Sequence, residues 1–159
     1  MKRFLLLFLA TVVTAWSASA QLSVSQLRTE HLTDPVGIGE RRPLSSWEVS
    51  DASRRGVTQS AYEIRVKSGG RTVWRTGKVA SAESAGVFYD GTPLTSDTRY
   101  TWQVRVWDDR GKASAWSRPA FWRTGLFDVG EWQARWIEPA VSDDLAAMFR
   151  RTFRVTKPV

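Results

Sequence analysis

Two pairs of adjacent acidic residues are the first candidates for chemistry, because paired carboxylates can act as general acid and general base. The pairs are Asp108-Asp109 and Asp143-Asp144. Neighbouring side chains on an extended chain point to opposite faces, and Asp at a turn usually bonds nearby backbone groups. We therefore interpret both pairs as solvated turn residues, and we predict no catalytic residue in this chain.

Other residues with ligand-binding potential stand alone. His31 is the single histidine, and the chain has no cysteine, which excludes disulfides, thiolate zinc sites and a cysteine nucleophile. We therefore predict no metal site and no cofactor. The segment Ser68-Gly69-Gly70-Arg71 is rich in glycine but lacks the Lys-Ser or Lys-Thr of a phosphate-binding loop, so it predicts a hairpin turn.

Tryptophan side chains are the remaining candidates for binding, since an exposed indole offers a flat apolar face to a sugar ring or to another domain. Trp107 and Trp74 occupy positions that alternation would give to solvent. The alternatives to sugar binding are packing on a neighbouring module, a cation–π contact with arginine, or a bulge that turns the ring inward. We predict Trp107, Trp74, Trp132 and Trp136 as contacts to carbohydrate or to another domain.

The charge balance is basic, with 23 Lys and Arg against 16 Asp and Glu and a formal net charge of +7. The arginine pairs Arg41-Arg42, Arg54-Arg55 and Arg150-Arg151 are dispersed along the chain and do not form one basic run. We therefore predict no nucleic-acid partner.

Strands with one dry face must position these residues, because the sequence alternates with period two. Apolar Tyr62, Ile64 and Val66 alternate with charged residues, and the segment Tyr100–Val106 shows the same pattern. Similar segments or turn signals recur every 8–12 residues or so, a spacing typical of a sandwich. The predicted strands are Leu22–Leu32, Leu44–Val49, Tyr62–Lys67, Thr72–Trp74, Val87–Tyr89, Tyr100–Val106 and Ala120–Thr124.

These seven strands predict an all-β, fibronectin type III-like or immunoglobulin-like sandwich over residues 21–125. The 42% hydrophobic and 12% aromatic content is sufficient for one such core. We predict Trp47, Tyr62, Tyr100 and Trp102 as core residues. Tyr100 also ends a segment that resembles a tyrosine corner, in which the hydroxyl bonds backbone a few residues upstream.

The first twenty residues have the pattern of a secretory signal peptide. Lys2 and Arg3 precede the apolar run Phe4–Val13, and Ala18-Ser19-Ala20 supplies small residues before the expected cleavage site after Ala20. The run is too short for a membrane span, so we expect a secreted or periplasmic chain with no span after cleavage. Loss of Lys2 and Arg3 lowers the formal charge from +7 to +5.

The pattern changes over residues 126–159. Trp132–Pro139 indicates a linker that becomes a short strand, and Met148–Val155 indicates another strand. Two strands cannot form a core of their own. We therefore predict that this segment is a linker and the first strands of a second, incomplete β-sandwich domain.

Several motifs, taken in order, are similar to a known family. They are Leu27–Leu32, Asp34–Ile38, Trp74–Val79, Tyr100–Asp108, Trp116-Ser117, Gly125-Leu126 and the Trp132-x-Ala134-x-Trp136-Ile137 step. Together they resemble the N-terminal region of bacterial α-L-rhamnosidases, which comprises a fibronectin type III-like module and the start of the next β-sandwich.

The resemblance implies a non-catalytic accessory module of a glycoside hydrolase that removes terminal α-L-rhamnose with inversion. In that family the catalytic carboxylates lie on a helical barrel far downstream, so no catalytic residue carries over to this chain. The implied partners are downstream domains of the same polypeptide and a rhamnose-containing glycan. The alternative is a free-standing exported domain that binds carbohydrate or protein.

Overall fold

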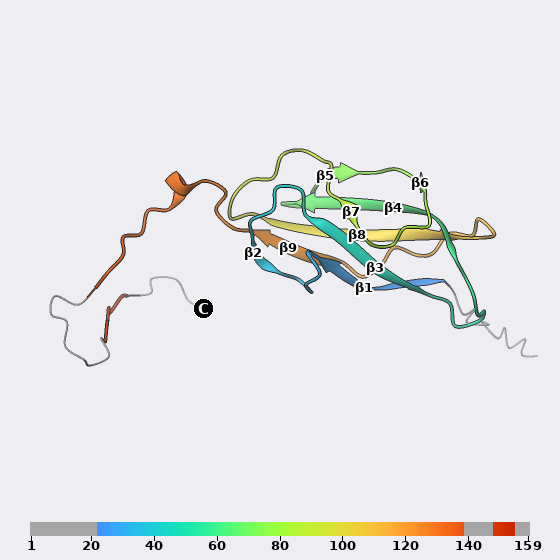
Figure 1. Cartoon of the computed structure of the whole chain (residues 1–159), viewed down its shortest axis with the longest axis horizontal. Helices are drawn as coiled ribbons and strands as arrows, with labels where there is room; N and C mark the ends of the chain where they lie inside the picture. The colour runs from blue at the N-terminus through green and yellow to red at the C-terminus, as the bar shows by residue number, and fades with distance from the viewer. Residues whose placement is uncertain (1–21, 139–147, 155–159) are drawn as a thin grey trace, which may run out of the picture. The chain divides into compact units, whose positions relative to one another are not determined.

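The computed structural model describes residues 22–138 and 148–154, in one compact unit that ends at Phe127 and a second that begins at Asp128. The first unit is an all-β sandwich whose two sheets form the layers seen in Figure 1. Its strands are β1 (Ser23–Thr29), β2 (Val36–Ile38), β3 (Leu44–Ser50), β4 (Gln59–Ser68), β5 (Arg71–Arg75), β6 (Val79–Ala80), β7 (Val87–Phe88), β8 (Arg99–Asp108) and β9 (Ala120–Thr124). The all-β prediction is therefore confirmed.

The smaller sheet has the order β1-β3-β7, and the larger has the order β2-β9-β8-β4-β5, with β6 also paired to β4. All pairs are antiparallel except the parallel pair β2 and β9. All seven predicted strands are present. The pattern missed β2 and β6, whose three and two residues show no alternation, whereas the equally short β7 lies in the predicted run Val87–Tyr89.

The first predicted strand ends earlier than expected. β1 stops at Thr29, and the next two residues, Glu30 and His31, have φ values of 50° and 62°. Two successive left-handed residues turn the chain here, and the N–H of Thr29 donates to the carbonyl of Leu32 at 2.9 Å. His31 is therefore an exposed turn residue.

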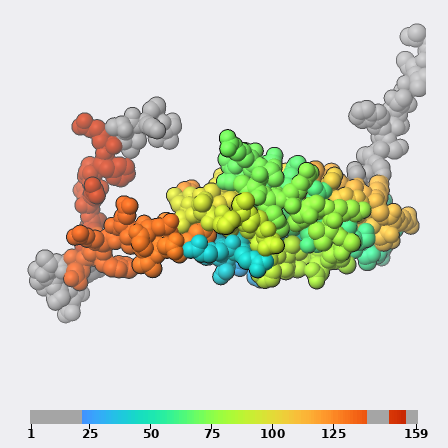
Figure 2. All heavy atoms as spheres, turned by 90° about the horizontal axis from the view of Figure 1, so that it is seen from above, coloured from blue at the N-terminus to red at the C-terminus, as the bar shows by residue number. Residues whose placement is uncertain are grey.

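β4 and β8 form the centre of the larger sheet, where their register pairs Ile64 with Val104 and Tyr62 with Val106. The apolar residues of both strands point into the sandwich, and Ile64, Val104 and Val106 have no exposed surface. The residues between them face outward. Seen from above, the surface of the first unit is made mostly by the green-to-yellow segments between β4 and β8 (Figure 2).

Aromatic rings fill the space between the sheets. Trp47, Tyr62, Tyr100 and Trp102 are all buried, with 8% exposure or less. The ring centroids of Trp47 and Tyr62 lie 5.3 Å apart edge to face, and Trp47 Nε1 donates to Gln59 Oε1 at 3.0 Å. These contacts join β3 of the smaller sheet to β4 of the larger one.

The predicted tyrosine corner is present. The Tyr100 hydroxyl accepts a hydrogen bond from the backbone N–H of Thr95 at 3.0 Å, five residues upstream. The Tyr100 ring stacks on Trp122 with centroids 5.4 Å apart. The corner therefore ties the loop before β8 to the core.

The second unit differs from the prediction. Residues 132–138 and 148–154 contain no strand, and the one regular element among the described residues after Phe127 is a single 3₁₀ turn, η1 (Val129–Glu131). A strand persists only when a neighbour takes its backbone hydrogen bonds, and no described strand pairs with these segments. The predicted signal peptide, residues 1–20, and the pair Asp143-Asp144 lie outside the described residues.

The Trp47→Ala substitution should destabilise the sandwich by about 3–5 kcal/mol, because it leaves a cavity between the sheets and removes the partner of Gln59. Urea denaturation followed by circular dichroism measures the change. The control is Trp132→Ala, since Trp132 is 61% exposed and its loss should leave the unfolding midpoint unchanged. Equal midpoints for Trp47→Ala and the unsubstituted chain would contradict this assignment of the core.

Candidate functional site

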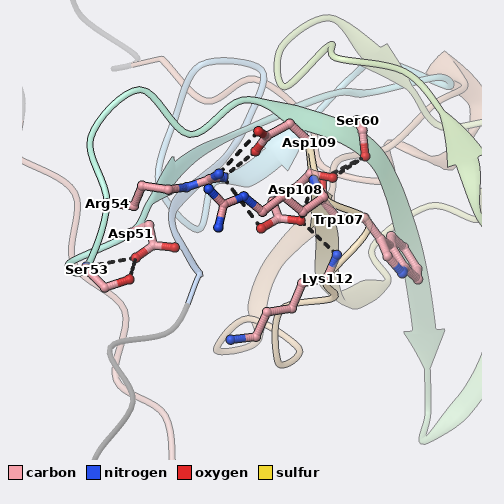
Figure 3. Close-up of polar contacts among 9 residues, drawn as sticks. Asp51, Ser53, Arg54, Ser60, Trp107, Asp108, Asp109 and Lys112 are labelled. Carbon is pink, nitrogen blue, oxygen red and sulfur yellow. Dashed lines mark hydrogen bonds and ion pairs between the residues drawn. The ribbon is translucent and has the colours of Figure 1, made fainter.

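The acidic pair Asp108-Asp109 lies at the end of β8, and both carboxylates form salt bridges with Arg54 (Figure 3). Asp108 Oδ1 accepts the backbone N–H groups of Arg110 and Lys112 at 3.0 and 2.7 Å, and Asp108 is buried. The pair thus closes the turn after β8, as predicted, but Asp108 is not solvated. The sequence pattern predicted a solvated carboxylate, whereas Asp108 accepts hydrogen bonds from two backbone N–H groups in place of water.

Hydrogen bonds lower the pKa of two carboxyl groups in this cluster, Asp109 and Asp51. The hydrogen bond from Arg54 lowers the pKa of Asp109, and the hydroxyl and backbone N–H of Ser53 lower the pKa of Asp51. A carboxylate that is held ionised in this way is a poor proton donor. Arg54 therefore connects the loop after β3 to the turn after β8, which is a structural role.

A second cluster lies on the outer face of the larger sheet around Glu63. Glu63 is 4% exposed although it is on the outward side of β4. Its Oε1 accepts from Arg75 Nε at 2.8 Å, and its Oε2 lies 2.6 Å from Arg105 Nη2. Two guanidinium groups from neighbouring strands thus cover one carboxylate, which compensates its burial.

Cations and indole rings extend this cluster across the sheet. The Arg105 guanidinium lies 4.9 Å from the Trp107 ring centroid and 5.0 Å from that of Trp116. Lys78 Nζ lies 4.7 Å from the Trp107 ring, and Arg65 lies 4.2 Å from the Trp116 ring. We call Lys78, Trp107, Arg105, Trp116 and Arg65 the Trp–Arg ladder.

The segment before β9 positions Trp116 in the Trp–Arg ladder. The hydroxyls of Ser114 and Ser117 accept the backbone N–H groups of Val106 and Val104 at 3.0 and 3.1 Å. The N–H groups of the same serines donate to the carbonyls of these valines at 2.8 Å. Two serines three residues apart thus attach this segment to the β8 edge. Trp116 was not among the predicted contact residues. The two serines that flank it, three positions apart, are the feature of the sequence that could have indicated its place.

The structure places the four predicted contact tryptophans in different surroundings. Trp107 is half-buried under Lys78 and Arg105, and in Figure 3 its indole points away from the Asp108 cluster. The register of β4 and β5 skips Val73, and this bulge turns Trp74 inward, where its ring centroid lies 5.0 Å from that of Tyr89. Of the alternatives considered for Trp74, the structure therefore shows the bulge that turns the ring inward.

Trp132 and Trp136 belong to the second unit and are open to solvent. Trp136 is 97% exposed and is followed by Ile137 at 68%. Exposed rings of this size next to an apolar side chain are candidates for a contact surface. They are the largest apolar groups that the described part of the second unit offers to another body.

Metal and membrane features are absent from the described residues. Within 22–138 and 148–154, no group of three or more His, Cys, Asp or Glu side chains is placed to hold a metal ion. In the same residues, no helix has the length and apolar character needed to cross a membrane.

Residues 24–128 match the family described as "Rha78A-like, N-terminal immunoglobulin domain". The chain belongs to this family. Its sandwich is therefore immunoglobulin-like, and the resemblance found in the sequence motifs is confirmed. The matched region begins in β1 and ends just after Phe127, so it coincides with the first unit.

Longer proteins contain the same domain. An α-L-rhamnosidase of Streptomyces avermitilis is 43% identical over 121 residues, which are 73% of this chain and 12% of that protein. An α-L-rhamnosidase of Formosa agariphila is 35% identical over 139 residues, 80% of this chain and 14% of the relative. The chain thus spans only 12–14% of the length of these curated relatives.

A solved structure agrees with the fold. The crystal structure of the Streptomyces avermitilis α-L-rhamnosidase with L-rhamnose superimposes with a TM-score of 0.71 and 43% identity. The superposition covers 75% of this chain and 12% of that one.

The Glu63→Gln substitution should lower the free energy of unfolding by about 2 kcal/mol, because it removes the negative charge between Arg75 and Arg105. Chemical denaturation measures the loss, and the accompanying change in tryptophan fluorescence reports the Trp–Arg ladder. Glu48→Gln is the matched control on the outer side of β3, where Glu48 is exposed. If both variants lose the same stability, Glu63 has no special role in this cluster.

Proposed function

We propose that this chain is the non-catalytic N-terminal module of an exported α-L-rhamnosidase-type glycoside hydrolase. The observation that carries the proposal is the family match over residues 24–128, which lies in a small N-terminal share of relatives named as α-L-rhamnosidases. Inverting hydrolysis needs an acid and a base about 6.5–9.5 Å apart across a sugar-sized cleft. The carboxylates that the structure gathers, Glu63 and Asp108-Asp109, are engaged by arginines instead.

The module's physical role is to brace and position downstream domains of the same polypeptide. Trp132 and Trp136 follow directly after the sandwich and are exposed, so they are the proposed contact residues. Burial of an indole ring of about 200 Å² stabilises a domain contact by several kcal/mol. The tyrosine corner at Tyr100 further supports a fibronectin type III-like kind of sandwich.

The export proposal rests on the first twenty residues. Their basic start, apolar run and small residues before Gln21 support a cleaved signal and a secreted or periplasmic location. When the chain is produced in a Gram-negative host, mass spectrometry of the periplasmic fraction should give a protein that begins at Gln21. Ala20→Arg should leave an uncleaved precursor, because the signal peptidase requires a small residue there. An unprocessed cytoplasmic chain without this substitution would overturn the proposal.

The purified chain should not hydrolyse p-nitrophenyl α-L-rhamnoside above the buffer rate, because residues 22–138 and 148–154 present no free acid–base pair across a cleft. Release of p-nitrophenolate measures the reaction. Turnover that co-purifies with the chain would end the non-catalytic assignment.

The positive control is the Streptomyces avermitilis relative, assayed intact and after deletion of its matching module. The intact relative should be active. The deletion should lower the temperature at which it loses activity, because a bracing module contributes stability to its neighbours. An unchanged inactivation temperature would argue against the positioning role.

A further inference from the structure

Positive charge gathers on one face of the sandwich. Seven cationic side chains occupy the outward side of the larger sheet or its margin, namely Arg65, Lys67, Arg75, Lys78, Arg99, Arg105 and Arg123. Two carboxylates bond to them, Glu63 and Asp97. Seven positive and two negative charges leave +5, which equals the formal charge of the whole chain after residue 20.

Four of these cations have no acidic partner. Among the residues that the structure describes, no carboxylate lies within 4.0 Å of Arg65, Lys67, Lys78 or Arg99, whereas the other three are in salt bridges. Lys78 and Arg99 are exposed, and Arg65 and Lys67 are partly exposed. Arg65 donates from Nε and Nη2 to Gln103 Oε1 at 3.2 and 2.8 Å, a neutral partner that leaves its positive charge uncompensated. The charges of these four cations are therefore available to an external anion.

The strand register places the four cations in a line. Arg65 and Lys67 are successive outward positions of β4, and Arg99 lies just beyond the pair of Ser68 with Tyr100. Lys78 precedes β6, whose Val79 pairs with Tyr62, so Lys78 is level with Glu63, one outward position before Arg65. Outward positions on a strand repeat about every 6.8 Å, so the line is about 20 Å long and runs diagonally across the sheet.

The rings on this face are covered by cations. Trp107 and Trp116 each have two cations within 5.0 Å of the ring centroid, and the Arg99 guanidinium lies 3.8 Å from the Phe121 centroid. Among the described residues, the one exposed large apolar side chain in the strands of this sheet is Val36 of the edge strand β2, and valine is too small to act as an aromatic anchor. The face thus lacks the apolar anchor that a protein interface requires and the open rings on which single-stranded nucleic acid stacks.

We propose that this basic face binds a linear anionic polysaccharide, whose regularly spaced carboxylate or sulfate groups meet Arg65, Lys67, Lys78 and Arg99. A guanidinium group donates two parallel hydrogen bonds to a carboxylate or sulfate, which a neutral sugar cannot match. Contacts with Trp116 and Phe121 hold Arg65 and Arg99 in place, so little side-chain entropy is lost on binding. The inference does not depend on the proposed rhamnosidase parent.

Isothermal titration of the purified chain with polygalacturonate, dextran sulfate and neutral dextran tests the proposal. Binding of polygalacturonate alone identifies a carboxylate ligand, binding of dextran sulfate alone identifies a sulfate ligand, and both outcomes support the inference. Dextran should not bind. Affinity should fall as sodium chloride rises from low to physiological concentration, because salt screens exposed charges. Failure to bind either anionic polymer at low salt overturns the proposal.

Charge-matched variants locate the site. The triple variant Lys67→Gln, Lys78→Gln, Arg99→Gln removes three cations of the line, and it keeps Arg65 because that residue packs on Trp116. The control Arg28→Gln, Arg55→Gln, Lys112→Gln removes three exposed cations elsewhere. The first variant should bind at least about tenfold more weakly, and the control should stay within about threefold. Equal losses would mean that net charge alone drives binding, and the proposal would fail.

Two further polymers separate glycans from other polyanions. Poly-L-glutamate represents an acidic protein, and a duplex DNA of random sequence represents nucleic acid. Either should bind more weakly than the preferred anionic polysaccharide. Binding of either as tightly as that glycan overturns the proposal. None of these measurements involves rhamnoside turnover, so their failure would leave the proposed accessory role unaffected.

Discussion

The antiparallel pairing of β4 with β8 is the constraint on which the rest of this sandwich depends. Side chains on a strand alternate between faces, so this one register directs Ile64 and Val104 into the core and Glu63 and Arg105 to the outer face. A slip of one residue would exchange the two sets, which would place charges between the sheets. The core and the basic face are therefore two consequences of the same pairing.

Arg105 links the two kinds of interaction on the outer face. It forms a salt bridge with buried Glu63, and its guanidinium also lies against the rings of Trp107 and Trp116. Partial burial of these groups strengthens their electrostatic attraction relative to the same groups in water. Ion pairs and cation–π contacts consequently connect the side chains of this outer face, the side that an antiparallel sheet commonly exposes to solvent.

Two features of the described residues bear on function. Their acidic clusters offer no free acid–base pair, and their second unit exposes two indole rings. Arginines neutralise the acidic residues that the fold gathers, and Trp132 and Trp136 are open to a neighbour. Both features are consistent with the accessory role proposed above. The family relationship agrees, since the chain matches an N-terminal domain and only a small part of each relative.

Local patterns predicted much of the fold, because alternation and turn residues are properties of short segments. They indicated seven of the nine strands of the first unit and the tyrosine corner at Tyr100, and they selected four residues that the structure buries. They missed β2 and β6, whose few residues become strands only because β9 and β4 offer them hydrogen bonds. They also predicted strands after Trp132 that the described residues lack, since alternation alone supplies no partner.

The sequence by itself determined the sandwich class, the family and the lack of cysteine chemistry, because composition, alternation and motif order are encoded along the chain. Tertiary structure alone decided which residues meet. It turned Trp74 inward through a bulge, buried Asp108, and brought Trp116 beside Arg65, which lies fifty-one positions earlier. The physical reason is that cation–π contacts, salt bridges and bulges depend on the register between strands that are distant in sequence.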